Sequence, residues 1–159
     1  MASIRESQIL ELEALATEIR RDSLKFIHNR GAGHPGGALS AAEILAVLYF
    51  RVLKVDPANP LDERRDRFIL SKGHASAAYY SALSRRGFFD ARELDHWGEA
   101  DCPHQGHPDR FMTPGVDMTS GILGHGVPVG VGLALAANLN KLNYRTYVLL
   151  GDGECQAGI

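Results

Sequence analysis

Several features are scarce in this sequence of 159 residues, and each scarcity argues against a class of protein. Only two cysteines occur, Cys102 and Cys155, far apart and without Cys-x-x-Cys spacing. This argues against a disulfide framework and favours a reducing compartment. The formal net charge is −2 and no basic cluster is present, which argues against a nucleic-acid surface. Residues 1–21 carry charges throughout, so we predict no signal peptide and expect a cytoplasmic protein.

Charged side chains are also missing from residues 118–140, a segment long enough to cross a membrane. It contains His125, Pro128 and several glycines, and small residues at this density suit a helix packed closely against protein. We therefore expect a buried core helix and no membrane association, with a membrane span as the alternative. A hydrophobic content of 45% fits one globular domain.

The N-terminal part of the sequence predicts two helices. Apolar residues recur at three- and four-residue steps over 9–28, as in an amphipathic helix, and a glycine-rich loop follows over 29–37. Ser40 and Glu43 have the spacing of a capping box. The helix body that follows, 44–53, is apolar on nearly every side and is expected to be buried.

The rest of the sequence alternates strands with helices. The charged run 62–67 mixes signs and is expected to form a solvated turn. The further predicted elements are strands at 68–70 and 145–150, an alanine-rich helix ending at Gly87, a short helix capped by Asp90 and Glu93, an irregular stretch over 100–126 and a helix over 128–142. This order predicts a helix-rich α/β fold with a partial parallel sheet. With two strands only, we expect an incomplete domain whose open side another segment or chain covers.

Four histidines directly follow a glycine: His34, His74, His107 and His125. Glycine lets the backbone approach a ligand closely, and imidazole exchanges protons near neutral pH. A single Gly-His pair is usually an ordinary turn. Four pairs, most of them in loops next to predicted elements, indicate a ligand site.

Two other motifs allow alternative interpretations. Residues 31–36 match Gly-x-Gly-x-x-Gly, but the match follows a helix instead of a strand, which disfavours a nicotinamide cofactor. A zinc site could use Asp101, Cys102, His104 and His107. No second ligand pair completes regular spacing, so a polar active-site loop is favoured over zinc.

The strongest local signal is the strand that ends in Gly151-Asp152-Gly153-Glu154. A carboxylate at the end of a strand is a suitable ligand for Mg²⁺, which binds through few carboxylates together with phosphate oxygens. The glycines leave space for a diphosphate, and free backbone N–H groups would face it. The alternative is a plain Gly-Asp-Gly turn.

Six motifs together resemble transketolase, particularly the N-terminal subunit of its two-chain forms. In order they are Gly33-His34-Pro35-Gly36-Gly37, Leu70-Ser71-Lys72-Gly73-His74-Ala75, Gly106-His107-Pro108, Thr113-Pro114-Gly115-Val116, Gly121-Ile122-Leu123-Gly124-His125-Gly126 and Gly151-Asp152-Gly153-Glu154. The resemblance implies thiamine diphosphate and Mg²⁺ as cofactors, and transfer of a two-carbon ketol unit from a ketose phosphate to an aldose phosphate.

The resemblance also implies roles for individual residues. His34 and His107 would line the substrate channel, and His74 would contact both the cofactor diphosphate and the substrate side of the thiazolium. The remaining cofactor-binding residues would be Gly121, Ile122 and Leu123 under the thiamine rings, Asp152 on Mg²⁺ and Gly153 on the diphosphate.

Residues 1–159 would then form the N-terminal part of a single thiamine diphosphate domain, truncated after the Gly-Asp-Gly motif. The Asn that completes the metal site in the family lies beyond Ile159, so we expect Asp152 alone to hold metal poorly. The expected partner is a C-terminal transketolase subunit or the remainder of the chain, in a homodimer or heterotetramer. His125 stands where Gln is usual and Ala157 where Glu is usual, which leaves the subunit-crossing acidic contact of the family in doubt.

Two rival functions stay open from the sequence. One is the related 1-deoxy-xylulose-phosphate synthase, which condenses pyruvate with a triose phosphate; Gly36 to Ser40 and Gly106 to Pro108 resemble transketolase more closely. The other is a non-catalytic truncated homologue that serves as a binding or assembly module.

Overall fold

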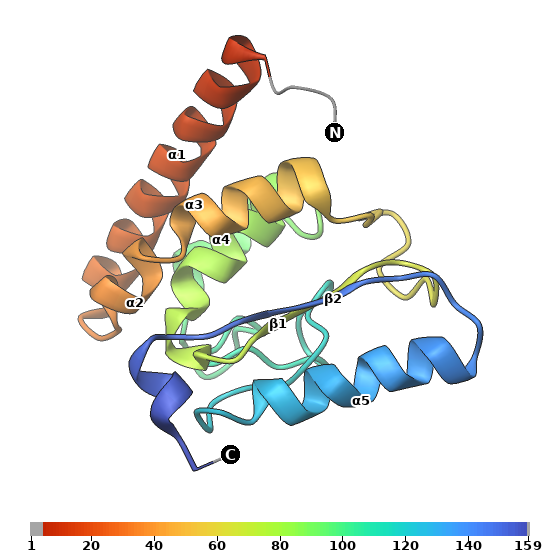
Figure 1. Ribbon diagram of the computed structural model, residues 1–159. Coiled ribbons are helices and arrows are strands. Elements are labelled where there is room, and N and C mark those ends of the chain that lie inside the picture. Colours follow the sequence, from red (N-terminus) through yellow and green to blue (C-terminus); the bar gives the residue numbers. More distant parts are fainter. Residues whose placement is uncertain (1–4, 159) are drawn as a thin grey trace.

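The computed structural model describes residues 5–158 (Figure 1). Its elements are α1 (Glu6–Arg30), α2 (Pro35–Leu39), α3 (Ala42–Val47), the π-helical turn η1 (Leu48–Val52), β1 (Arg67–Leu70), the 3₁₀ turn η2 (Gly73–Ala75), α4 (Ser76–Arg86), the 3₁₀ helix η3 (Ala91–His96), α5 (Gly126–Leu139), β2 (Thr146–Leu149) and the 3₁₀ turn η4 (Gly153–Gln156). The predicted long helix, both strands, and the helix closed by Gly87 in the left-handed conformation are confirmed, with boundaries shifted by one to three residues.

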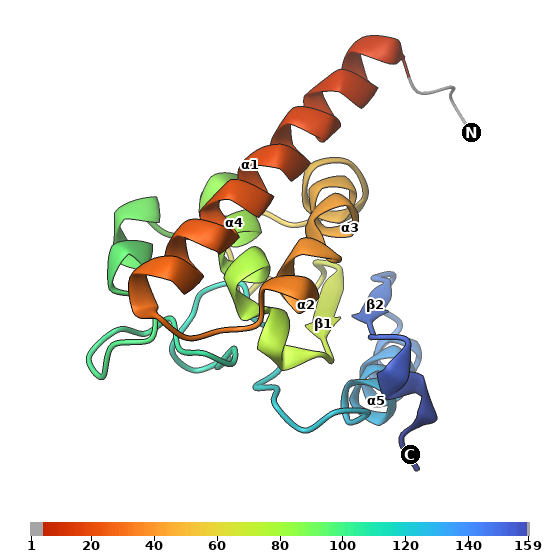
Figure 2. The same ribbon diagram turned by 90° about the vertical axis from the view of Figure 1, so that its left-hand side faces the viewer.

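The α/β fold class is confirmed by a parallel pair of strands. Within the described residues β1 pairs with β2, with Phe68 opposite Tyr147 and Leu70 opposite Leu149. Figures 1 and 2 show α3 and α4 on one face of this pair, α5 on the other face, and α1 outside α3 and α4. The carboxyl ends of both strands therefore lie at one edge of the pair.

Side chains alternate between the two faces of the strands, as strand geometry requires. Phe68 and Leu70 join the core cluster that also contains the inner faces of α1, α3 and α4. Ile69 and Val148 face α5, and two glycines let that helix come close. A Cβ on Gly130 would lie 2.5 Å from Val148 Cγ2, and a Cβ on Gly126 would lie 2.4 Å from the Cβ of Ser71. Gly126 and Gly130 are thus required by the approach of α5 to the strands.

The expectation that the charge-free segment forms a fully buried helix is wrong. α5 buries only Gly126, Gly130 and Ala137 among the described residues, while 55% of Val131 and 56% of Leu135 are exposed. The helix has 14 residues and begins at Gly126, two residues before the predicted start, because Pro128 is tolerated in its first turn.

A different stretch, Pro35–Val52, is long enough to cross a membrane, with a mean hydropathy of 1.2, and 33% of it is buried. Length and composition alone carry little weight here, because core helices pass the same test. Ala38, Ala42, Leu45 and Tyr49 in this stretch belong to the core cluster beneath α1 and α4. The expectation that the segment 44–53 is buried on nearly every side is wrong in part, since Ile44 and Val47 are 43% and 40% exposed.

The predicted capping box at Ser40 and Glu43 is also wrong. α3 begins at Ala42 after Ala41, and no side chain caps it. Residues 35–37, expected to lie in the loop 29–37, instead belong to α2, with Pro35 at a first-turn position that favours proline. Ser40 Oγ donates to the carbonyl oxygen of Gly37, and Glu43 pairs with Arg20 on α1. Tertiary partners outcompete the local cap.

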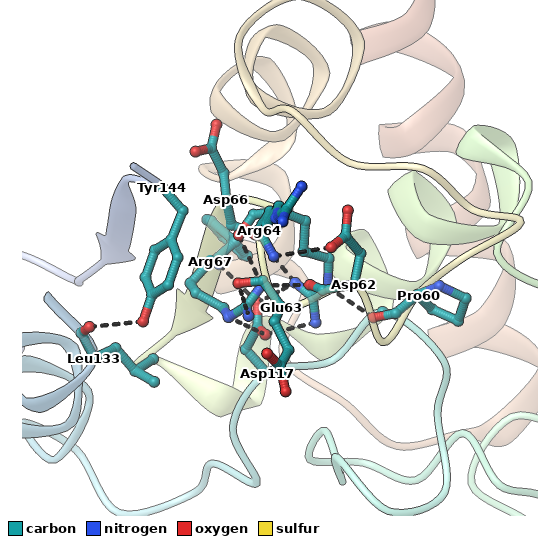
Figure 3. A network of polar contacts seen from close by, with 12 residues as sticks. Pro60, Asp62, Glu63, Arg64, Asp66, Arg67, Asp117, Leu133 and Tyr144 are labelled. Atoms are coloured by element: carbon teal, nitrogen blue, oxygen red, sulfur yellow. Dashed lines mark hydrogen bonds and ion pairs between the residues drawn. The ribbon is translucent and has the colours of Figure 1, made fainter. Parts of the chain in front are cut away.

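The charged run 62–67 forms a partly buried polar network instead of a solvated turn (Figure 3). Arg65 donates two hydrogen bonds to Asp117, at 2.7 and 3.0 Å, and Asp117 also accepts from the Phe68 backbone N–H. Asp66 is 3% exposed and accepts from the backbone N–H groups of Lys54 and Arg145. The network ties the long loop before β1 to the start of both strands.

Candidate active site

The loops that follow the two strands meet at their carboxyl edge. Ser71 to His74 follow β1, residues 151–154 follow β2, and the segment 121–126 leads into α5 beside them. A Cβ on Gly73 would lie 2.7 Å from Ser120 Oγ and 3.0 Å from the backbone nitrogen of Gly121, so the first and third loops are in direct contact. In parallel α/β sheets this edge is where ligands bind.

Three of the predicted histidines line one cavity next to these loops. His34, His74 and His107 surround a space of about 250 Å³, with Arg30 and Trp97 on its wall. The rings of His34 and His74 meet edge to face, with centroids 5.2 Å apart. The structure thus brings together the three residues predicted to be catalytic, from segments far apart in the sequence.

The position of His74 explains one glycine of the first motif. A Cβ on Gly37 would lie 2.7 Å from His74 Cδ2, so any other residue would push the imidazole away. Burial lowers the pKa of His74, and the neighbouring His34 and Lys72 lower it further. His74 is therefore neutral at pH 7, able to donate one hydrogen bond and accept another.

His107 is held through its backbone. Tyr80 on α4 donates a hydrogen bond to the His107 carbonyl oxygen at 3.2 Å, and Ser76 donates to the carbonyl of Gly106 at 2.7 Å. These two bonds fasten the irregular stretch 100–126 to the most deeply buried helix. A Cβ on Gly121 would lie 3.6 Å from His107 Cδ2, which places the third loop beside this histidine.

The predicted cofactor residues of this third loop lie on the surface. Gly121 is exposed, and 69% of Ile122 and 45% of Leu123 are exposed. These two exposed aliphatic side chains directly follow Gly121, the residue that lies beside His107. A flat aromatic ligand could rest on these apolar side chains.

Asp152 and Gly153 lie at the exposed tip of the loop after β2. Within the described residues no hydrogen bond or ion pair engages the Asp152 carboxylate, and the space around Gly153 is open. Residues 5–158 contain no group of three or more His, Cys, Asp or Glu side chains placed to hold a metal. One free carboxylate has the right oxygen chemistry for Mg²⁺, but it would require water, phosphate and further protein ligands.

The structure assigns contacts to two residues that the sequence left without a role. The buried Glu154 carboxylate accepts hydrogen bonds from Ser71 Oγ and from the backbone N–H groups of Gly124 and Gly151. Lys72 is 6% exposed, and its Nζ donates to Ser40 Oγ at 2.8 Å. Both residues belong to the six transketolase-like motifs, but the spacing of residues in a motif does not reveal whether a side chain points inward or outward.

The alternative interpretations do not fit this geometry. His104 is fully buried, and its two ring nitrogens face Thr113 and Glu93. Cys102 Sγ approaches the Glu93 carbonyl oxygen, so these side chains do not converge on a common zinc position.

Residues 31–36 join α1 to α2 with no preceding strand, unlike a dinucleotide-binding loop. His125, the fourth Gly-His residue, is exposed just before α5 and is not among the residues lining the histidine cavity.

Comparison with known proteins gives one consistent family. Residues 12–159 match the family model described as transketolase, thiamine diphosphate binding domain. The chain is 42% identical over 147 residues to one subunit of the apulose-4-phosphate transketolase of Phocaeicola vulgatus, covering 92% of this chain and 52% of that protein. It is 43% identical over 151 residues to the 6-deoxy-6-sulfo-D-fructose transketolase subunit SqwG of a Clostridium species, covering 95% and 55%.

Solved structures agree with the sequence comparison. Transketolase from Leishmania mexicana superposes with a TM-score of 0.86 at 35% identity, over 92% of this chain and 24% of that chain. The chain spans about half the length of the two curated subunits and about a quarter of that transketolase. On both sequence and structure, the chain belongs to the transketolase family, and residues 12–159 match the thiamine diphosphate binding domain of that family.

Proposed function

We propose that this chain supplies part of the active site of a transketolase that uses thiamine diphosphate and Mg²⁺ to move a two-carbon ketol unit from a ketose phosphate to an aldose phosphate. The observation that carries the proposal is the single cavity lined by His34, His74 and His107. This cavity lies beside the strand ends, where ligands of α/β proteins bind.

The histidines of the cavity divide into two roles in the proposed reaction. His34 and His107 are exposed toward the cavity and would hydrogen-bond sugar hydroxyls or the reacting oxygen. His74 is neutral and half-buried, so it can hold a proton on one ring nitrogen and accept one on the other. Gly37 keeps that imidazole in place by leaving it room.

The cofactor-binding part of the proposal concerns the other loops. Thiamine diphosphate, when bound, supplies the nucleophilic carbon and the electron sink for a two-carbon transfer. Asp152 would contribute one carboxylate to Mg²⁺, and the Gly153 N–H would donate to a diphosphate oxygen. Gly121, Ile122 and Leu123 would support the thiamine rings, as their exposure beside the cavity allows.

A partner is part of the proposal because one carboxylate does not complete a magnesium site. We propose that residues 1–159 are the N-terminal part of a single cofactor domain, and that a C-terminal subunit or further chain provides the missing ligands. The complete enzyme would be a homodimer or heterotetramer. The names of the two relatives specify different sugars at 42% and 43% identity, so identity at this level does not assign the sugar pair.

Reconstitution tests the proposal directly. The chain is co-expressed with a C-terminal transketolase subunit and with the proposed remaining segment of the cofactor domain, and cofactor binding is measured by calorimetry with thiamine diphosphate and Mg²⁺ together and singly. We expect binding and two-carbon transfer, followed by mass spectrometry of the sugar phosphates, only when both cofactors are present. If a stable assembly showed neither cofactor binding nor two-carbon transfer, the transketolase proposal would be refuted in favour of a non-catalytic module. Tight binding by this chain alone would refute the need for a partner.

A further inference from the structure

We infer that Glu154 is a positioning residue whose buried carboxylate holds three loops of the cofactor site together before any ligand arrives. The inference rests on the proposed function for the identity of that ligand. Its geometric basis, the contacts of the carboxylate, does not depend on that function.

The carboxylate joins the loops through both of its oxygens. Oε1 accepts from Ser71 Oγ at 2.5 Å and from the Gly124 backbone N–H at 2.7 Å. Oε2 accepts from the Gly151 backbone N–H at 2.9 Å. Ser71 follows β1, Gly124 precedes α5 and Gly151 follows β2, so one side chain bonds to all three segments.

Ser71 extends this connection into α5. Its Oγ accepts a hydrogen bond from the Gly126 backbone N–H at 3.1 Å while it donates to Glu154. The close fit at Gly126, where a Cβ would overlap Ser71, fixes the distance between the helix start and the strand end. The start of α5 is therefore tied to Glu154 through a chain of two hydrogen bonds.

The bond from Gly151 to Glu154 also closes a tight turn. Asp152 and Gly153 are the two residues between its ends, and they form the exposed tip. These are the residues proposed to meet the metal and the diphosphate. Because both ends of the turn are bound, the direction in which Asp152 leaves the backbone is set without any contact to its own side chain.

The partners of the carboxyl suit this role, because a hydroxyl group and two backbone N–H groups all donate to its oxygens. Hydrogen bonds to a carboxylate are stronger than those between neutral groups. Lys72, whose Nζ bonds the carbonyl of Gly37 and the hydroxyl of Ser40, adds positive charge nearby.

Glu154 is not a catalytic residue in this arrangement. It is 6% exposed and does not line the cavity formed by the three histidines. We therefore expect its loss to weaken cofactor binding far more than turnover at saturating cofactor.

The decisive variant is Glu154→Gln, which keeps the size of the side chain but replaces one acceptor oxygen with an N–H₂ group. Whichever way the amide turns, at least one of the three donors loses its acceptor, because Oε1 accepts from Ser71 and Gly124 and Oε2 accepts from Gly151. Glu63→Gln is the matched control, because Glu63 is exposed and its carboxylate has no partner among the described residues. Both are measured in the enzyme assembled with its C-terminal partner.

For Glu154→Gln we expect the Kd for thiamine diphosphate with Mg²⁺ to rise about tenfold or more, as for an unsatisfied buried donor. We expect kcat at saturating cofactor to stay within about threefold, and Glu63→Gln to change neither. Without cofactor, hydrogen exchange in peptides covering 121–126 and 150–156 should become faster in Glu154→Gln only. A Kd within twofold of the parent enzyme, or a fall in kcat as large as the rise in Kd, would overturn the inference.

A milder variant covers the case in which Glu154→Gln does not fold. Ser71→Ala leaves the carboxylate with its two backbone donors, so we expect faster exchange at 121–126 and a smaller rise in Kd. Unchanged exchange and Kd in Ser71→Ala would count against the inference. If the parent assembly binds no thiamine diphosphate, the proposed function fails. The exchange measurements then still decide whether Glu154 holds the loops.

Discussion

The two sides of the strand pair are built differently, although helices cover both. On one side α4 buries every residue from Ser76 to Ser84. On the other side α5 contains no charged residue, yet most of its side chains are exposed. β1 is buried along most of its length, whereas every residue of β2 is half-exposed. Burial thus follows the number of neighbouring layers and not the hydrophobicity of the helix.

The same contrast divides the candidate site. His34 and His74 belong to the densely packed side, where α1, α3 and α4 fix the backbone. Asp152, Ile122 and Leu123 belong to the open side, where the described chain offers few neighbours. The histidine cavity is therefore largely prepared by this chain. In our proposals, the cofactor-binding part depends on Glu154 and on a partner that supplies the missing ligands.

The largest expected effect tests whether the packed side carries the chemistry. In the assembled enzyme, His74→Ala should lower kcat/KM by about 10²-fold or more, because a proton-transferring group in the cavity is lost. His28→Ala, on the exposed surface near the end of α1, should leave it within about twofold. Steady-state kinetics measures kcat/KM for both variants and the parent enzyme. Equal losses in the two variants would mean that the histidine assignment is wrong.

The next effect compares the two helices by one matched substitution. Leu83→Ala in α4 removes a fully buried side chain and should lower the free energy of unfolding by about 2–5 kcal/mol. Leu135→Ala in α5 removes a side chain that is 56% exposed and should change it by less than about 0.5 kcal/mol in the isolated chain. Urea denaturation measures both. A larger loss for Leu135→Ala in the assembled enzyme alone would place that face in the interface.

Within α5, glycines separate the packed face from the open one. Gly130→Ala would drive a methyl group into Val148 and should cost about 1–3 kcal/mol. Gly132→Ala meets open space and should stabilise the helix by up to about 1 kcal/mol. Thermal denaturation of the two variants should shift in opposite directions. If both shift the same way, α5 does not approach the strands as described.

The smallest effect concerns pH and the loop fastened to the packed side. Burial lowers the pKa of His104, while the neighbouring Glu93 opposes this in part. The folded state therefore binds a proton on His104 less readily than the unfolded state does. As a result, the free energy of unfolding is unaffected by His104 above about pH 6.5 and decreases as the pH falls below this value. His104→Gln should show a flatter stability profile between pH 7.5 and 5.5 by urea denaturation. An unchanged slope would mean that His104 does not contribute to it.

The sequence predicted most of the elements because each depends on local chemistry. Apolar periodicity located α1, Gly87 closed α4 in the left-handed conformation, and Asp90 with Glu93 formed the expected capping box. The order of the six motifs also led to the correct family. The spacing of Ser40 and Glu43 predicted a capping box that the structure does not contain. Contacts to Lys72 and Arg20 replace the capping hydrogen bonds.

By itself, the sequence determined most of the helices, the two strands and the set of histidines, since propensity, periodicity and glycine positions act over a few residues. Only the tertiary structure decided which of these groups are buried and which meet. The run around Arg65 became a partly buried network because Asp117, far along the chain, lies beside it. Glu154 turned inward because Ser71 and Gly124 offered donors there. Burial and hydrogen-bond satisfaction depend on partners distant in sequence, and residue spacing does not encode them.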